Sequence, residues 1–124
     1  FYDWLEQQQA DIVCLQETKA QAGILDPALR EPPGWHTYFV DAEKPGYSGV
    51  AVFSRHAPDA VVRGLGWADF DREGRYLQLD FGRLSVASLY LPSGSSSEQR
   101  QAAKFDFLAR YMPVLRAQRA LGRE

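Results

Sequence analysis

Asp11-Ile12-Val13-Cys14-Leu15-Gln16 is a short apolar and partly β-branched run that follows a helical stretch and a polar turn. A run of this length after a helix is typical of a buried strand in an α/β layer. It leads directly into Glu17-Thr18-Lys19, which places charged side chains at the exit of the strand. We therefore expect residues 11–16 to form a core strand whose end carries functional groups.

Further segments downstream have the composition of strands. They are residues 35–40, 50–54, 61–65, 75–81 and 84–90. A tight turn at 81–84 is predicted to join the last two as a hairpin. Residues 20–34 are predicted to be a loop with a short helix at 26–29, in which Asp26 is the N-cap and Pro27 the first helical residue.

The C-terminal part of the chain carries a helical pattern. Phe105, Leu108, Met112 and Leu115 recur at helical spacing and predict an apolar stripe that packs on a sheet. Pro113 predicts a kink or a break in this helix. One sheet with helices on one face leaves its other face uncovered, so a second layer of the same kind is expected to complete the fold. The sequence thus predicts an α/β fold, one half of a four-layer sandwich of mixed, largely antiparallel sheet with flanking helices.

Length and composition narrow the class of protein. The chain of 124 residues has the length of one domain. Its composition, with 45% hydrophobic and 24% charged residues, excludes a disordered, collagen-like or coiled-coil chain. No apolar run approaches the roughly 18 residues that span a bilayer, so we expect no membrane partner. The single cysteine, Cys14, cannot form an internal disulfide, which favours a reducing cytoplasm. Because Phe1 begins inside a helical stripe and a helical pattern stops at Glu124, we expect residues 1–124 to be a partial domain, truncated at both ends.

The net charge of −2 conceals an uneven distribution. Residues 63–124 hold 10 of the 14 basic side chains but only 7 of the 16 acidic ones. The basic residues toward the C-terminal end are Arg100, Lys104, Arg110, Arg116, Arg119 and Arg123. Two interpretations stay open, a solvated helix face or a patch that faces phosphates.

Four loops at strand ends hold the residue types from which a site could be built. They are residues 16–19 (QETK), 46–49 (GYSG), 73–75 (EGR) and 90–94 (YLPSG). Neighbouring strands could bring all of them to one rim of the sheet. Glu17 either pairs with Lys19 or coordinates a hard cation such as Mg²⁺, which prefers oxygen ligands. Tyr90 is either an ordinary tyrosine at the rim of the core or a functional phenol.

In order and spacing, these segments resemble the exonuclease III family, the bacterial AP endonucleases of the endonuclease/exonuclease/phosphatase superfamily. The resemblance is carried by LQETK at 15–19, YSGVA at 47–51, EGR at 73–75 and YLPSG at 90–94. It implies a DNase I-like four-layer α/β sandwich and hydrolysis of DNA phosphodiesters in base excision repair. It also implies Mg²⁺ as cofactor, with Mn²⁺ as an alternative ion, and double-stranded DNA with abasic sites or 3′ ends as partner. We expect a monomer in the bacterial cytoplasm.

The resemblance also implies roles for individual residues. Glu17 matches a metal ligand of the family, and Tyr90 matches its active-site tyrosine. Tyr47 and Arg75 match residues that contact DNA phosphates. Ser93 stands where the family commonly has a phosphate-contacting polar residue. We expect Lys19 to orient nearby carboxylates without touching substrate.

Several family segments have no counterpart in these 124 residues. They are the first strand with its Asn, the Gly-Asp-x-Asn segment, a later Asp and the Asp-His pair, so we expect this chain alone to be inactive. Residues 64–66, 71–78 and 91–94 also resemble the catabolite repression control proteins, translational regulators of the same fold without nuclease activity. Those proteins tend to lose the metal glutamate and the active tyrosine, whereas Glu17 and Tyr90 are present here, which favours the enzyme. A phosphoinositide or sphingomyelin phosphodiesterase is a third alternative, disfavoured by LQETK.

Overall fold

The computed structural model describes residues 1–92 and 98–124. The elements follow one another as α1 (Tyr2–Gln7), β1 (Ile12–Gln16), η1 (Ala22–Ile24), α2 (Pro27–Arg30), β2 (His36–Val40), β3 (Val50–Ser54), β4 (Ala60–Arg63), α3 (Ala68–Asp71), β5 (Tyr76–Phe81), β6 (Leu84–Leu89) and α4 (Glu98–Ala120). The predicted short helix is confirmed as α2, whose N-cap Asp26 accepts a hydrogen bond from the backbone N–H of Ala28. Within the described ranges, no helix is long and apolar enough to cross a bilayer.

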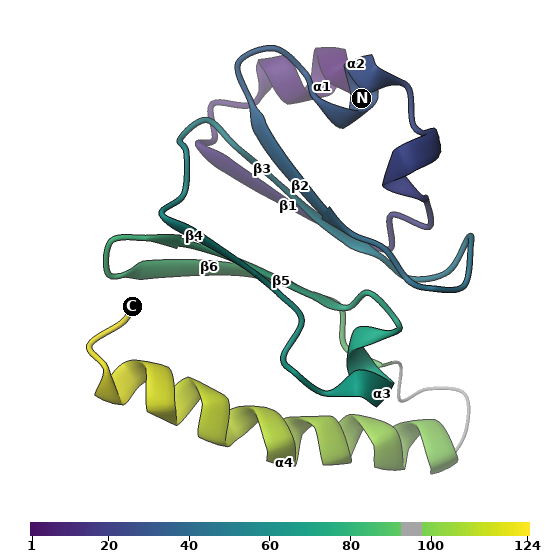
Figure 1. The fold of residues 1–124 in the computed structure, drawn as a ribbon, viewed down its shortest axis with the longest axis vertical. Coiled ribbons are helices and arrows are strands. Elements are labelled where there is room, and N and C mark those ends of the chain that lie inside the picture. The colour runs from purple at the N-terminus through teal and green to yellow at the C-terminus, as the bar shows by residue number, and fades with distance from the viewer. Residues whose placement is uncertain (93–97) are drawn as a thin grey trace.

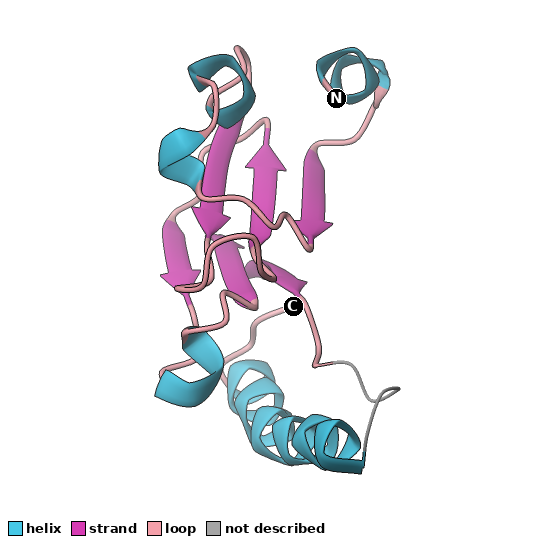
Figure 2. Ribbon diagram, turned by 90° about the vertical axis from the view of Figure 1, so that its right-hand side faces the viewer, coloured by secondary structure: helices cyan, strands magenta, loops and turns pink. Residues whose placement is uncertain are grey.

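The strands form two antiparallel sheets of three strands each, ordered β1-β3-β2 and β4-β5-β6. In the first sheet, Ala51 of the central strand pairs with Leu15 of β1 and Phe39 of β2. In the second sheet, Phe81 stands opposite Leu84, which confirms the predicted hairpin between β5 and β6. Figure 2 shows the strands stacked between the helices.

Side-chain alternation along the central strands builds the core between the sheets. Val50 and Val52 of β3 point to one face, as Leu77 and Leu79 of β5 do, and all four side chains are fully buried in one cluster. Each fully buried Val or Leu contributes about 1.5–3 kcal/mol to folding. Cys14 packs against this cluster, and its partial burial raises the pKa of the thiol.

Helices cover the two outer faces of the sheets. Phe53 of β3 packs with Leu5 of α1 on the outside of the first sheet. On the outside of the second sheet, Tyr76 of β5 packs with Phe70 of α3 and Phe107 of α4. The layers therefore run helix, sheet, sheet, helix (Figure 1). The predicted α/β sandwich with antiparallel sheets and flanking helices is confirmed.

Two details of the predicted arrangement are wrong. The sequence predicts one sheet with helices on one face, whereas the described residues contain parts of both sheets and of both helical layers. The reason is that both faces of β3 are apolar, and the outer face of β5 begins with the large ring of Tyr76, so each of these strands is covered on both sides. The run at 11–16 is predicted to be the buried strand, but within the described residues β1 is half-buried and pairs only with β3, which is the fully buried strand.

The packing face of α4 also differs from the predicted stripe. Phe105, Met112 and Leu115 are 60%, 44% and 41% exposed, whereas Phe107 is only 3% exposed. Of the predicted stripe, Leu108 packs against the cluster that Phe107 forms with α3 and β5. The ring of Phe107 stacks at 4.6 Å on an aromatic residue of α3. This contact between aromatic rings selects a neighbouring face of the helix, which helical periodicity alone does not distinguish.

Pro113 does not interrupt α4, which continues through it to Ala120. A proline inside a helix removes one backbone hydrogen bond, here the one to the carbonyl of Ala109. Both residues are exposed. Because the lost hydrogen bond faces water, the carbonyl can be hydrated and the helix is retained.

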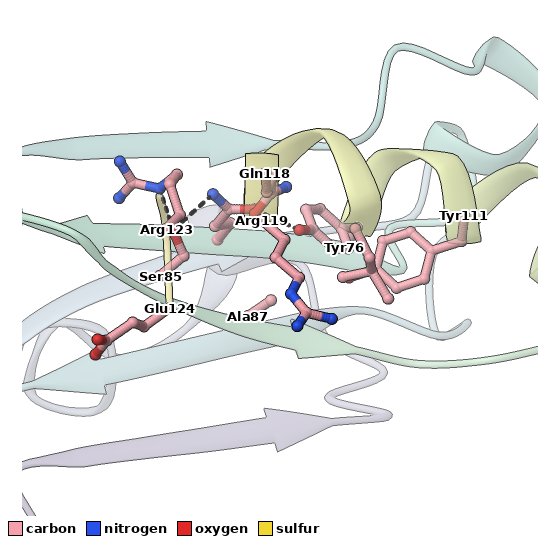
Figure 3. Close-up of a pocket in the computed structure, with 10 residues that line it drawn as sticks. Tyr76, Ser85, Ala87, Tyr111, Gln118, Arg119, Arg123 and Glu124 are labelled. Atoms are coloured by element: carbon pink, nitrogen blue, oxygen red, sulfur yellow. Dashed lines mark hydrogen bonds between the residues drawn. The ribbon is translucent and has the colours of Figure 1, made fainter. Parts of the chain in front are cut away.

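Figure 3 shows a pocket of about 370 Å³ between α4 and the outer face of the second sheet. Tyr76 lines this pocket, is 2% exposed, and donates a hydrogen bond to Oε1 of Gln78 at 2.5 Å. At the far end, Nε of Arg123 donates to Oγ of Ser85 at 2.6 Å. Burial raises the pKa of Tyr76 above its ordinary value, because the charged phenolate is poorly solvated there.

This pKa shift predicts a loss of stability at alkaline pH. The unfolded chain releases the Tyr76 proton near about pH 10, and the folded protein releases it only at higher pH. The contribution of the neutral phenol to the free energy of unfolding is therefore full below about pH 10 and is lost above it. Urea unfolding between neutral and alkaline pH should show this decline. The decline should be smaller in Tyr76→Phe, and an equal decline in both proteins would contradict the assignment.

Candidate functional site

The four loops predicted to meet at one rim come together in the structure. β1 ends beside the start of β3, because Gln16 pairs with Val50. β6 ends beside the start of β5 through the register of their hairpin. The backbone N–H of Gly49 donates to the carbonyl of Gly74 at 3.1 Å, which joins the rims of the two sheets. Figure 1 shows the loop before β3 and the loop before β5 at the same end of the strands.

The loop after β1 has an uncommon backbone conformation. Glu17 and Lys19 have left-handed φ angles of 55° and 50°. Non-glycine residues rarely adopt this region, at a cost of about 1–3 kcal/mol each where the surroundings impose it. The backbone N–H groups of Thr18 and Lys19 donate to the carbonyls of Gly49 at 3.2 Å and Ser48 at 2.7 Å. The loop that carries Glu17 is thus clamped to the loop before β3.

Two glycines at this rim allow other segments to approach closely. Gly49 has a φ of 90°, and a Cβ there would collide with Oγ1 of Thr18. Gly74 has a φ of 61°, and a Cβ there would lie 2.5 Å from the backbone N of Ala42 and the backbone C of Asp41. Backbone atoms cannot move aside as the end of a flexible side chain can. Gly74 is therefore required where the loop before β5 meets the chain after β2.

We expect Gly74→Ala to lower the free energy of unfolding by about 2–5 kcal/mol, because left-handed strain adds to overpacking. Gly82 is a matched control, since its φ is 57° and a Cβ there would meet nothing within 4 Å. Gly82→Ala should cost only the strain, about 1–2 kcal/mol. Chemical unfolding of both variants measures the difference. An equal loss of unfolding free energy in the two variants would contradict the close approach of the backbone at Gly74.

Tyr90 and Glu17, which lie 73 positions apart in the chain, are hydrogen bonded at the rim. The Tyr90 hydroxyl donates to Oε1 of Glu17 at 2.6 Å. This hydrogen bond raises the pKa of Tyr90, because the carboxylate stabilises the protonated phenol. Lys19, the alternative partner of Glu17, is exposed and forms no ion pair with it. Over residues 1–92 and 98–124, Tyr90 is the only residue hydrogen bonded to this carboxylate.

Arg75 and Tyr47 lie beside Tyr90 in one network. Arg75 is 5% exposed. Its Nε donates to Oε2 of Glu73 at 2.7 Å, its Nη2 to the hydroxyl of Tyr47 at 3.0 Å, and its Nη1 to the carbonyl of Tyr90 at 3.2 Å. Tyr47 is 38% exposed, and Nζ of Lys44 lies 5.6 Å from its ring centroid. The structure thus buries Arg75 and leaves Tyr47 open to solvent.

Ion pairs place two of the predicted basic residues away from this network. Ser93 lies outside the described residues. In the basic C-terminal segment, Arg110 forms an ion pair with Asp69 at 3.1 Å, and Arg123 forms one with Asp80 at 3.2 Å. Arg110 therefore joins α4 to α3, and Arg123 joins the C-terminal segment to β5 of the second sheet.

Glu17 offers one carboxylate to a metal ion. No group of three or more His, Cys, Asp or Glu that could hold a metal occurs in the described part of the chain. Mg²⁺ is commonly bound through only one or two carboxylates, with waters and substrate phosphates as the other ligands. Glu17 is exposed, and among the described residues its carboxylate is hydrogen bonded to the neutral phenol of Tyr90. It therefore fits one ligand of such a site.

Sequence reasoning misses two residues that build this rim. Ser88 is fully buried, donates to the carbonyl of Leu15 at 2.9 Å and accepts from Nε2 of Gln16 at 2.8 Å. It ties the end of β1 to β6 in the other sheet, and its only sequence signal is a hydroxyl inside an apolar strand. Glu73, the ion-pair partner of Arg75, stands in a segment that the sequence singles out for its arginine alone.

Comparisons with known proteins agree with this geometry. The sequence profile of the endonuclease/exonuclease/phosphatase family matches residues 1–120. The exodeoxyribonuclease of Bacillus subtilis (strain 168) is 41% identical over 100 residues, which cover 81% of this chain and 38% of that protein. The DNA repair nuclease APEX1 of Danio rerio is 34% identical over 125 residues, which cover 96% of this chain and 40% of that protein.

Solved structures show the same similarity. An AP endonuclease from Archaeoglobus fulgidus superposes with a TM-score of 0.73 at 30% identity, covering 87% of this chain and 41% of that one. The 3′-5′ exonuclease NExo from Neisseria meningitidis superposes with a TM-score of 0.67 at 28% identity, covering 90% and 46%. The chain spans about two fifths of the length of the Bacillus subtilis and Danio rerio relatives. The resemblance found in the sequence is confirmed, and this chain belongs to the endonuclease/exonuclease/phosphatase family.

Proposed function

We propose that the protein is a Mg²⁺-dependent phosphodiester hydrolase of the exodeoxyribonuclease III and AP endonuclease type. Its proposed substrate is double-stranded DNA with abasic sites or 3′ ends. The observation that carries the proposal is the 2.6 Å hydrogen bond between Tyr90 and Glu17, which sets a phenol and a carboxylate together at an exposed rim. The similarity to an exodeoxyribonuclease and to a DNA repair nuclease supports the same reaction.

The residues of the rim have separate tasks in this reaction. Divalent-metal dependence is general in the family, and Glu17 would hold Mg²⁺, or Mn²⁺ in its place. A divalent ion supplies polarisation of the phosphoryl oxygens when bound. Tyr90 has one hydroxyl proton, which it donates to Glu17 in the structure. Once an ion is held by that carboxylate, the hydroxyl would donate instead to an oxygen that gains charge in the transition state. Lys19, exposed beside Glu17, orients the carboxylates of the site.

Tyr47 and Ser93 are the proposed phosphate contacts. Tyr47 suits this task because it is 38% exposed and has the ammonium of Lys44 beside its ring. Such contacts release counterions, so binding of duplex DNA should weaken as the salt concentration rises. These phosphate contacts carry no base information, so the loss of affinity with salt should be equal for all DNA sequences. The monomeric state and the bacterial cytoplasmic location stay predictions.

The test is cleavage of a duplex with a single abasic site by the full protein. We expect incision in Mg²⁺ and none in EDTA, with slow release of nucleotides from the 3′ ends of an undamaged control duplex. No cleavage of either duplex would contradict the proposal. Binding of RNA by such a silent protein would instead favour the translational regulator.

A further inference from the structure

We propose that Arg75 is a positioning residue that holds Tyr90 and Tyr47 at the rim, and that it does not itself contact DNA phosphate. The inference rests on the proposed function and concerns how the same site is built. It departs from the role that the family resemblance implies for this arginine. Three observations support the inference. Arg75 is buried, it forms an ion pair with Glu73, and it donates hydrogen bonds to both tyrosines.

The charge of Arg75 is already compensated inside the protein. Its side chain is 6% exposed, and its Nη2 lies 2.6 Å from Oε2 of Glu73. A charged side chain this buried is stable only when it is paired and hydrogen bonded. A phosphate that approached the guanidinium would have to compete with the carboxylate of Glu73. The pair is neutral as a whole and adds little to the attraction of DNA.

The hydrogen bonds of Arg75 fix both tyrosines. Three of the five N–H donors of an arginine are used, toward Glu73, Tyr47 and Tyr90. In return, the backbone N–H of Tyr90 donates to the carbonyl of Arg75 at 2.9 Å. The guanidinium carbon also lies 5.0 Å from the centroid of the Tyr90 ring. One residue thus holds Tyr90 at its amide, its carbonyl and its ring.

The position of Tyr90 matters because its hydroxyl reaches Glu17 at 2.6 Å. Displacing a reacting group by about 1 Å can cost on the order of 10²-fold in rate. Arg75 forms no hydrogen bond or ion pair with Glu17, and it acts on Glu17 through Tyr90. A lysine cannot reproduce this arrangement, because it lacks the planar fork of donors. A lysine can, however, replace an arginine that serves phosphate as a point charge.

Arg75→Lys therefore separates the two roles. We would measure kcat and KM on the abasic duplex, and the slope of the logarithm of the binding constant against the logarithm of salt concentration in EDTA. Positioning predicts a kcat lower by ~10-fold to 10²-fold with KM and the salt slope unchanged. Retained kcat would overturn the inference. An unchanged salt slope would then show that the lysine serves phosphate as a point charge, and a slope smaller by about 0.9 would show that one phosphate contact had been lost.

Arg55→Lys is the matched control, since this arginine also covers an aromatic ring. Its guanidinium lies 4.1 Å from the ring of Trp35, and it follows the end of β3 that is remote from the rim. The control should match the wild-type protein in kcat, KM and salt slope. It shows that loss of an arginine–aromatic contact as such does not lower kcat.

Glu73→Gln tests the same inference if Arg75→Lys fails to fold, and the two roles predict effects of different kinds. If Arg75 positions Tyr90, weakening the ion pair lowers kcat, although the positive charge left at the rim raises DNA affinity. If Arg75 contacts phosphate, releasing its guanidinium from Glu73 tightens DNA binding and does not lower kcat, which would overturn the inference. Adding Arg75→Lys to Tyr90→Phe gives a further check, because a residue that acts through Tyr90 costs little once the hydroxyl is gone.

Failure of the inference is distinguishable from failure of the proposed function. A wild-type protein that cleaves abasic DNA, with an Arg75→Lys variant that keeps kcat, overturns the inference alone. A wild-type protein that neither binds nor cleaves the duplex overturns the proposed function, and the inference with it.

Discussion

The Glu17→Gln variant is expected to cleave abasic duplex DNA at least about 10²-fold more slowly than the wild-type protein. Glutamine keeps the size of the side chain and a hydrogen-bond acceptor for Tyr90 but removes the charge that would hold Mg²⁺. Replacing a residue that only supports a metal ligand typically lowers metal affinity or activity 10–100-fold. Replacing a ligand itself should lower activity at least as much. We also expect the Mg²⁺ titration of the remaining activity to move to higher concentration.

Binding of Mg²⁺ measured by calorimetry gives a readout that does not depend on cleavage. Glu31→Gln is a matched control, because Glu31 is also exposed and follows α2 on the outer side of the first sheet. It should behave as the wild-type protein in both measurements. An unchanged Mg²⁺ titration in the Glu17→Gln variant would show that this carboxylate does not bind the metal.

The Tyr90→Phe variant is expected to lose a factor on the order of 10² to 10³ in kcat, the usual effect of removing one hydrogen-bond donor to developing charge. The ring and its packing remain, so the change tests the hydroxyl alone. In the metal-free protein, the hydrogen bond to Glu17 raises the pKa of Tyr90, because the carboxylate stabilises the protonated phenol.

Tyr38→Phe is the control for this change. Like Tyr90, Tyr38 is partly buried and packs against the core between the sheets, and an arginine, Arg63, lies 5.9 Å from its ring centroid. Single-turnover cleavage of the abasic duplex should be the same in Tyr38→Phe and in the wild-type protein. A Tyr90→Phe variant that cleaves as fast as this control would show that the Tyr90 hydroxyl has no role in the chemical step.

Most element boundaries could be predicted from the sequence, because local alternation and turn residues decide them. The strand at 50–54, the hairpin turn at 81–84 and the cap of α2 follow from such local signals. The division of the strands between two sheets could not be predicted in the same way. It depends on which apolar face of β3 meets which face of β5, and a strand with two apolar faces does not specify its partner.

The residues at the rim could be found individually, but their environments could not. Glu17 and Tyr90 are recognisable from their segments, yet their hydrogen bond depends on how two sheets are joined. Arg75 is the clearest case, since an arginine at a strand start is expected to be exposed and is instead 5% exposed. Its burial depends on Tyr47 and Tyr90, which lie 28 and 15 positions away in the chain.

The central claim is that Glu17 and Tyr90 act as one site of a metal-dependent nuclease, and a double-mutant cycle tests it most directly. Single-turnover rates on the abasic duplex in Mg²⁺ are compared for the wild-type protein, Glu17→Gln, Tyr90→Phe and the double variant. Residues that act as a unit give strongly non-additive losses. We predict that the double variant is about as slow as the slower single variant. Losses that multiply, or a wild-type protein that does not cleave, would contradict the account.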